Sequence, residues 1–235
     1  GSFVEKPAAS GLVRSNFLRF TKEAEEGEGP FISSFYPVSG ASGQYVTLRG
    51  RGFGGARGMS QVFFGSTEAA YDFPDMCLNS VWRDNQVVVK VPNGLADGYQ
   101  TISLKIGTTT IDSLRLNPNS FIVDQAQSLK ASLCKIEPDR GPAATPVTLW
   151  GEYFGAVNSE GLVKFNYDKT ATGTIKKDGR ADKIETKVPS GAISGPVRVV
   201  KNSSWGNELN FSVGSCQVDS DCGTQVCCPS NTYKA

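Results

Sequence analysis

The stretch VTLRGRGFGG, residues 46–55, alternates apolar and polar side chains and then runs into a glycine cluster around one aromatic residue, Phe53. The alternation predicts a β-strand. A glycine-rich loop after a strand is also the setting in which backbone N–H groups hold a phosphate. The stretch therefore raises two hypotheses, a nucleotide site and a purely structural turn.

An internal repeat favours the structural turn. The segment PVSGASGQYVTLRGRGFG (37–54) aligns without a gap with PDRGPAATPVTLWGEYFG (138–155), at an offset of 138 − 37 = 101. A second match joins VKVPNGLADG (89–98) to TKVPSGAISG (186–195). The positions shared by the first match include Pro37/Pro138, Gly40/Gly141, Gly50/Gly151, Phe53/Phe154 and Gly54/Gly155. A phosphate loop would have to exist twice, so we interpret the glycines as a sharp turn that folds Phe53 and Phe154 back into two cores.

Each repeat is predicted to be β throughout. Short alternating segments are separated by Asn-Gly and Asp-Gly pairs, which tolerate positive φ in tight turns. The inward positions that we expect are Val46, Leu48, Val87, Val89, Val91, Ile102, Leu104 and Ile106 in the first copy, and Val147, Leu149, Ile184, Val188, Val197 and Val199 in the second. About seven short strands per copy are typical of an antiparallel sandwich. The predicted fold is all-β, with two tandem immunoglobulin-like sandwiches.

The order proline, glycine, VTL.G..FG, V.F and V.VP resembles the IPT/TIG family of immunoglobulin-like domains, which plexins and some transcription factors share. The resemblance covers residues 30–124 and 132–214. It implies two sandwiches of this type but no single function, because the family serves in receptor ectodomains, bacterial surface proteins, transcription factors and polysaccharide-processing enzymes. The expected organisation is 1–29 as an extension and linker, 30–124 and 132–214 as domains, 125–131 as a linker and 215–235 as a cysteine-rich tail.

Composition excludes several classes of function. Lys plus Arg is 24 and Asp plus Glu is 23, so no basic field favours nucleic acid, and no apolar run is long enough to insert in a membrane. Histidine is absent, which removes Ser-His and Cys-His catalysis and histidine-based zinc sites. We predict a non-enzymatic protein without a cofactor or a metal.

The six cysteines indicate an oxidising compartment. Four of them crowd into CQVDSDCGTQVCC and lack paired C-x2-C knuckles, which favours disulfides over a zinc site. The disulfide candidates are Cys77, Cys134, Cys216, Cys222, Cys227 and Cys228. A Cys77–Cys134 bond would fix the angle between the domains, whereas another scheme ties Cys134 to the tail and a third leaves both as buried thiols. Sequence does not choose among them.

The segment GLVRSNFLRF (11–20) resembles the closing strand of a sandwich whose other strands are missing. A strand of this kind pairs with an open sheet edge, which in a neighbouring subunit would give head-to-tail assembly. The end of a truncated domain and an amphipathic helix are the alternatives. The candidate subunit-interface residues are Leu12, Val13, Phe17, Leu18 and Phe20.

We therefore predict a non-catalytic extracellular or cell-surface protein, a stalk, adhesin or assembly subunit that self-associates or binds another surface protein. The alternative is a carbohydrate-binding module. The observation that discriminates between them is whether Trp82, Trp150 and Trp205 line an exposed flat face, where they could stack on sugar rings, or pack in the core or at its rim.

Overall fold

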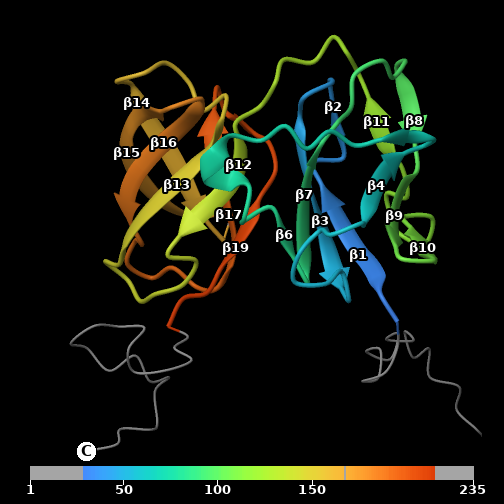
Figure 1. Cartoon of the computed structure of the whole chain (residues 1–235). Helices are drawn as coiled ribbons and strands as arrows, with labels where there is room; N and C mark the ends of the chain where they lie inside the picture. Colours follow the sequence, from blue (N-terminus) through green and yellow to red (C-terminus); the bar gives the residue numbers. More distant parts are fainter. Residues whose placement is uncertain (1–28, 167, 215–235) are drawn as a thin grey trace, which may run out of the picture.

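The computed structural model describes residues 29–166 and 168–214, which fold into two β halves side by side (Figure 1). Within these residues every regular element is a strand except one three-residue 3₁₀ helix, so the all-β prediction is confirmed. The first half contains β1 (Phe31–Tyr36), β2 (Ser39–Gly40), β3 (Tyr45–Arg51), β4 (Gln61–Phe64), β5 (Thr67–Glu68), the helix η1 (Asp75–Cys77), β6 (Trp82–Arg83), β7 (Gln86–Lys90), β8 (Gly98–Gln100), β9 (Ile102–Ile106), β10 (Thr109–Asp112) and β11 (Phe121–Val123). The second contains β12 (Ser132–Glu137), β13 (Pro146–Glu152), β14 (Glu160–Phe165), β15 (Lys169–Asp178), β16 (Ala181–Lys187), β17 (Gly195–Lys201), β18 (Ser204–Trp205) and β19 (Leu209–Phe211).

Three sheets form the first half, in the strand orders β1-β3-β7-β6, β10-β9-β4-β5 and β2-β11-β8. The stretch that opened the sequence analysis supplies β3, which lies between β1 and β7 and pairs antiparallel with both. Its apolar positions Val46 and Leu48 are fully buried, as the alternation predicts. They pack with Val62, Phe64, Ile102 and Leu104 from the facing sheet, which gives this half its own core.

The second half is built on a more continuous sheet, in the order β12-β13-β16-β15-β14-β17-β18, with β19 paired to β17. Its longest strand is the ten-residue β15. The first part of β15 pairs with β14, and its last four residues pair with β16. This one strand therefore carries the chain from one face of the sandwich to the other.

The first half replaces that long strand with a loop. Residues 69–81 leave the sheet, form η1 and contact β12 and β13 of the second half, where Figure 1 shows the loop crossing. The structure joins Cys77 of η1 to Cys134 of β12 in a disulfide. This is one of the pairings that sequence left open, and it places a covalent bond between the halves. Tyr45, Phe73 and Val88 of the first half share a core cluster with the second half.

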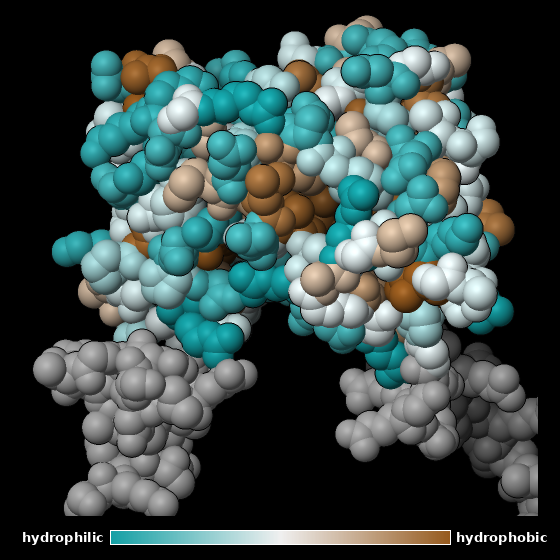
Figure 2. Space-filling model, in the orientation of Figure 1, coloured by the Kyte–Doolittle hydropathy of each residue, from teal (hydrophilic) through white to brown (hydrophobic). Residues whose placement is uncertain are grey.

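Buried polar groups also cross the seam between the halves. Asn207 is fully buried; its amide nitrogen donates to Thr47 Oγ1 at 3.0 Å and to the carbonyl of Leu133 at 2.7 Å, while its oxygen accepts from the Leu133 N–H. Gln44, equally buried, donates to Ser132 Oγ at 2.9 Å. Because unpaired buried polar groups are costly, these bonds specify one relative position of the two halves. Figure 2 shows apolar surface gathered in the hollow between them.

Candidate functional site

The glycine cluster is a packing device in both halves. A Cβ on Gly50 would lie 2.0 Å from the carbonyl oxygen of Phe31, and one on Gly151 would lie 1.8 Å from that of Ser132, so neither position admits a side chain. Phe53 and Phe154 are both buried, as the repeat predicts.

The backbone donors of this loop are already used. In the first half, Gly52 and Gly54 N–H groups donate to the carboxylate of Asp84 at 3.3 and 3.0 Å. In the second, the Phe154 N–H donates to Asp182 at 2.9 Å. An internal carboxylate thus occupies the place that a phosphate would take in a nucleotide loop, which agrees with the structural interpretation.

The repeat breaks at one position of this turn. Gly52 has φ +70°, and its counterpart at the offset of 101 is Tyr153, with φ +64°. Glycine adopts this left-handed conformation freely, whereas a bulky side chain does so at a cost of about 1–3 kcal/mol. Strain of this kind is concentrated at functional sites. Sequence reasoning missed Tyr153, although the alignment of GRGFG with GEYFG contained the signal.

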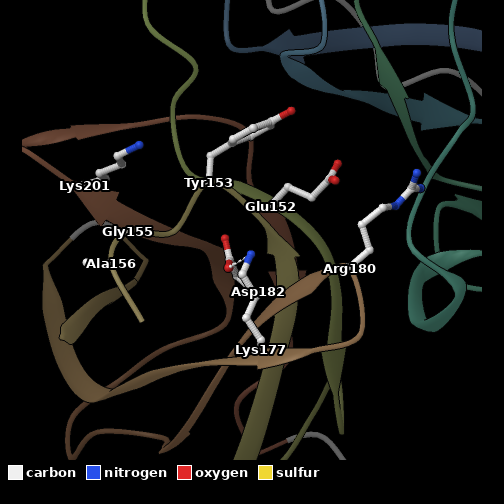
Figure 3. A pocket seen from close by; sticks show the side chains of 8 residues that line it. All are labelled: Glu152, Tyr153, Gly155, Ala156, Lys177, Arg180, Asp182 and Lys201. Atoms are coloured by element: carbon white, nitrogen blue, oxygen red, sulfur yellow. Dashed lines mark ion pairs between the residues drawn. The ribbon is translucent and has the colours of Figure 1, made fainter. Parts of the chain in front are cut away.

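Tyr153 forms a wall of an open pocket of about 420 Å³ (Figure 3). The pocket lies on the second half beside the seam, and a small-molecule site is typically about 300–1,000 Å³. In Figure 3 the Tyr153 ring stands between Lys201 on one side and Glu152 and Arg180 on the other. Tyr153 as a whole is 36% exposed. The residues that line the pocket are Glu152, Tyr153, Gly155, Ala156, Lys177, Arg180, Asp182 and Lys201.

Both carboxylates of the pocket are neutralised by neighbours. Glu152 Oε2 accepts from the Tyr45 hydroxyl at 2.6 Å and lies 2.9 Å from the buried ammonium of Lys90, both across the seam. Asp182 Oδ1 pairs with Lys177 at 2.6 Å, as the dashed line in Figure 3 marks. The acids are therefore held in place by the fold and are not available to a cationic ligand.

Two cations of the pocket have no carboxylate partner among the residues that the structure describes. Arg180 donates to the backbone carbonyl of Asp72 across the seam. The backbone carbonyl of Lys201 accepts from Ser204 Oγ at 3.1 Å, but its side chain has no ion-pair or hydrogen-bond partner in the described part of the chain. Burial raises the pKa of the Tyr153 hydroxyl, and Glu152 and Asp72 add to this effect, so the hydroxyl stays protonated and can donate. Burial raises the pKa of the Tyr45 hydroxyl as well, and the hydrogen bond to Glu152 and its charge add to this effect.

The tryptophans do not form an exposed face. Trp82 and Trp150 are 5% and 6% exposed, and their indole N–H groups bond to the Phe53 carbonyl and to Asp178. Trp205 is 37% exposed, but its N–H donates to the Tyr36 hydroxyl at 2.7 Å across the seam. A sugar-binding surface made of the three tryptophans is therefore excluded, so a sugar site in the described part of the chain has to use another aromatic side chain.

The remaining predicted site residues are not brought to this pocket. Cys77 and Cys134 lie in the seam as a disulfide. Residues outside the described ranges include the subunit-interface candidates Leu12, Val13, Phe17, Leu18 and Phe20, and the tail cysteines Cys216, Cys222, Cys227 and Cys228. Over residues 29–166 and 168–214, no cluster of three metal-ligating side chains and no helix able to cross a bilayer is found.

With this geometry in place, comparison with known proteins assigns the first half. Residues 30–123 match the IPT/TIG domain family. The first half is an IPT/TIG domain. Its matched range ends one residue short of the domain expected from the sequence.

Three curated relatives share the name cyclomaltodextrin glucanotransferase. The chain is 33% identical over 88 residues to the enzyme of Niallia circulans and 30% identical over 92 residues to that of Bacillus sp. (strain 1-1). These matches cover 37% and 39% of this chain but only 11% and 12% of the enzymes. The similarity is therefore to a small part of each enzyme.

The solved structures that match this chain come from several kinds of protein. A γ-CGTase from alkalophilic Bacillus clarkii matches with a TM-score of 0.34 and 18% identity, over 82% of this chain and 27% of that one. The extracellular region of plexin A4 matches at 0.30 and 16%, over 87% and 20%. The protein SGBP-B from a xyloglucan utilization locus in Bacteroides uniformis matches at 0.29 and 16%, over 80% and 50%. Likeness at this level does not assign a function.

Proposed function

We propose that this chain is a non-catalytic carbohydrate-binding module of an extracellular or cell-surface protein, with the Tyr153 pocket as its binding site. The observation that carries the proposal is the aromatic ring of Tyr153, held on a left-handed backbone where the repeat has glycine, at the wall of an open pocket. An aromatic face beside a few fixed polar groups is the usual composition of a small-ligand site.

The matched enzymes support this choice of ligand over a purely adhesive role. Their name states that they act on glucans, and the segment they share with this chain is a small part of their length. Because function lies in sites rather than in the fold, we take from these enzymes only the class of ligand and not their chemistry.

The test replaces Tyr153 with the residue of the other repeat. Tyr153→Gly removes the ring and relieves the left-handed strain, so the free energy of unfolding changes by no more than about 1 kcal/mol. Calorimetric titration with neutral and acidic hexasaccharides, maltohexaose and hexagalacturonate, should show binding to the native chain and at least about a tenfold loss in the variant.

Tyr99→Ala is the matched control. Tyr99 lies on β8, is 77% exposed and does not line the pocket, so its removal should leave sugar binding unchanged. Equal loss in both variants, or no binding of either sugar to the native chain, would remove the proposal.

A rigid spacer is the second candidate. It is favoured by the disulfide and the buried hydrogen bonds across the seam, which oppose the hinge motion expected between ordinary tandem domains. Small-angle scattering that fits one rigid body would support it.

Self-association through residues 12–20 stays a prediction. A chain that lacks residues 1–24 should keep both halves folded, but light scattering should no longer detect particles heavier than the monomer.

A further inference from the structure

The pocket has an imbalance of charge that bears on the class of sugar. Its lining carries three cationic side chains, Lys177, Arg180 and Lys201, and two carboxylates, Glu152 and Asp182. Lys177 pairs with Asp182, and Lys90 from outside the pocket pairs with Glu152, so an uncharged ligand would make no use of the charges of Arg180 and Lys201. A ligand with a positive charge would find no free carboxylate.

The two cations that have no carboxylate partner lie on opposite sides of the Tyr153 ring. Lys201 ends β17 on one side of the ring, and Arg180 stands in the turn between β15 and β16 on the other side (Figure 3). The carbonyl of Asp72 takes one guanidinium N–H of Arg180, which leaves further donors of that group, and the hydroxyl of Tyr153 stays protonated. The site therefore offers donors in excess of acceptors.

Resting on the proposed function, we propose that the pocket selects a sugar that bears a carboxylate, a uronic acid residue of a glycan. The sugar ring lies against Tyr153, and its carboxylate accepts from the ammonium of Lys201. Hydrogen bonds to a charged partner contribute about 1.5–3 kcal/mol, roughly twice the neutral kind, so the carboxylate decides the preference.

The acids of the pocket do not cancel this preference because the fold already neutralises them. Glu152 is balanced by Lys90, a lysine that is only 5% exposed and comes from the other half of the chain. Asp182 is balanced by Lys177 and by the Phe154 N–H. The first half thus contributes to the charge of a pocket in the second.

Titration calorimetry with hexagalacturonate and maltohexaose tests the idea on the full chain. Hexagalacturonate should bind about tenfold more tightly, the equivalent of one charged hydrogen bond. Raising the salt from about 0.1 M to about 1 M shortens the screening length from about 10 Å to about 3 Å and should remove most of that advantage. Binding of maltohexaose should not respond to salt.

Two variants locate the effect. Lys201→Met keeps the aliphatic stem and should lose most of the preference for the acidic sugar while leaving maltohexaose binding unchanged. Lys105→Met, an exposed lysine on β9 outside the pocket, is the control for net charge and should change neither.

The outcomes separate the two proposals. If maltohexaose binds as tightly as hexagalacturonate and Tyr153→Gly abolishes both, the carboxylate preference is wrong and the carbohydrate function stands. If poly-glutamate binds as well as hexagalacturonate and does not need Tyr153, the pocket recognises charge alone and both proposals fail. Loss of preference in Lys105→Met also overturns the assignment to Lys201.

Discussion

Gly52 in the first half and Tyr153 in the second occupy the same left-handed position of the same turn, and Tyr153 lines an open pocket. In the first half a Cβ on Gly52 would lie 2.9 Å from Pro30, so the turn is closed by packing. In the second half the same backbone carries a ring out to the surface. The comparison shows that one residue decides whether the same turn packs against its own half or carries an aromatic ring to the surface.

The largest expected effect on stability comes from removing the buried phenylalanine ring that follows the glycine turn in each half. Phe53→Ala and Phe154→Ala each remove a fully buried ring, and each should lower the free energy of unfolding by about 3–5 kcal/mol. Urea denaturation followed by fluorescence measures it. Because the halves share buried contacts, both variants should show one shifted transition rather than two; two separate transitions would mean that the halves are independent.

Sequence predicted much of what the halves have in common. The alternation in β3, the glycine at the turn and the buried Phe53 and Phe154 follow from local rules that act within a few residues, namely strand periodicity, positive φ and close backbone approach. Because these features occur in both copies of the repeat, aligning the two copies was enough to predict them.

What differs between the halves was not predictable in the same way. The crossing of residues 69–81 into the second half depends on contacts between segments far apart in the chain, and buried polar residues such as Gln44 and Asn207 have no local pattern. Tyr153 could have been found as a non-glycine residue at a glycine position. Its neighbours Arg180 and Lys201, more than twenty residues away, are brought to it only by the sheet.

The second prediction concerns the Cys77–Cys134 disulfide, which joins the two halves. Replacing Cys77 and Cys134 together by alanine opens a loop with a sequence separation of 57 and should lower stability by about 2–4 kcal/mol. Thermal unfolding, with the native chain compared with and without reductant, measures it. Reductant should shift the native chain to nearly the value of the double variant and leave the variant unchanged.

The third prediction concerns the buried amide of the seam. Asn207→Ala leaves the Leu133 N–H and carbonyl and the Thr47 hydroxyl without their partner, which should cost about 1–3 kcal/mol. Asn210→Ala, an exposed neighbour on β19, is the control and should change stability by less than about 0.5 kcal/mol. Equal effects would show that the seam is not specified by this amide.

The smallest expected effect comes from Asp139, which stands in the second half where the aligned repeat has Val38. Burial would raise the pKa of the Asp139 carboxyl, but the hydrogen bonds and charges of Arg83, from the first half, and of Arg140 outweigh it and hold that pKa below its ordinary value of 3.8. A lowered folded pKa gives stability that is present above the ordinary value and is lost as the pH falls through the folded pKa.

Asp139→Asn keeps the shape and removes the charge. Because the Asp139 and Arg83 side chains are 27% and 46% exposed, solvent screens the pair, and the loss at neutral pH should stay below about 1 kcal/mol. Urea denaturation of both proteins from pH 7 downward should show curves that stay parallel above the ordinary pKa and converge below it. A difference that persists unchanged into acid would mean that the asparagine disturbs packing, and that this ion pair adds nothing to the contact between the two halves.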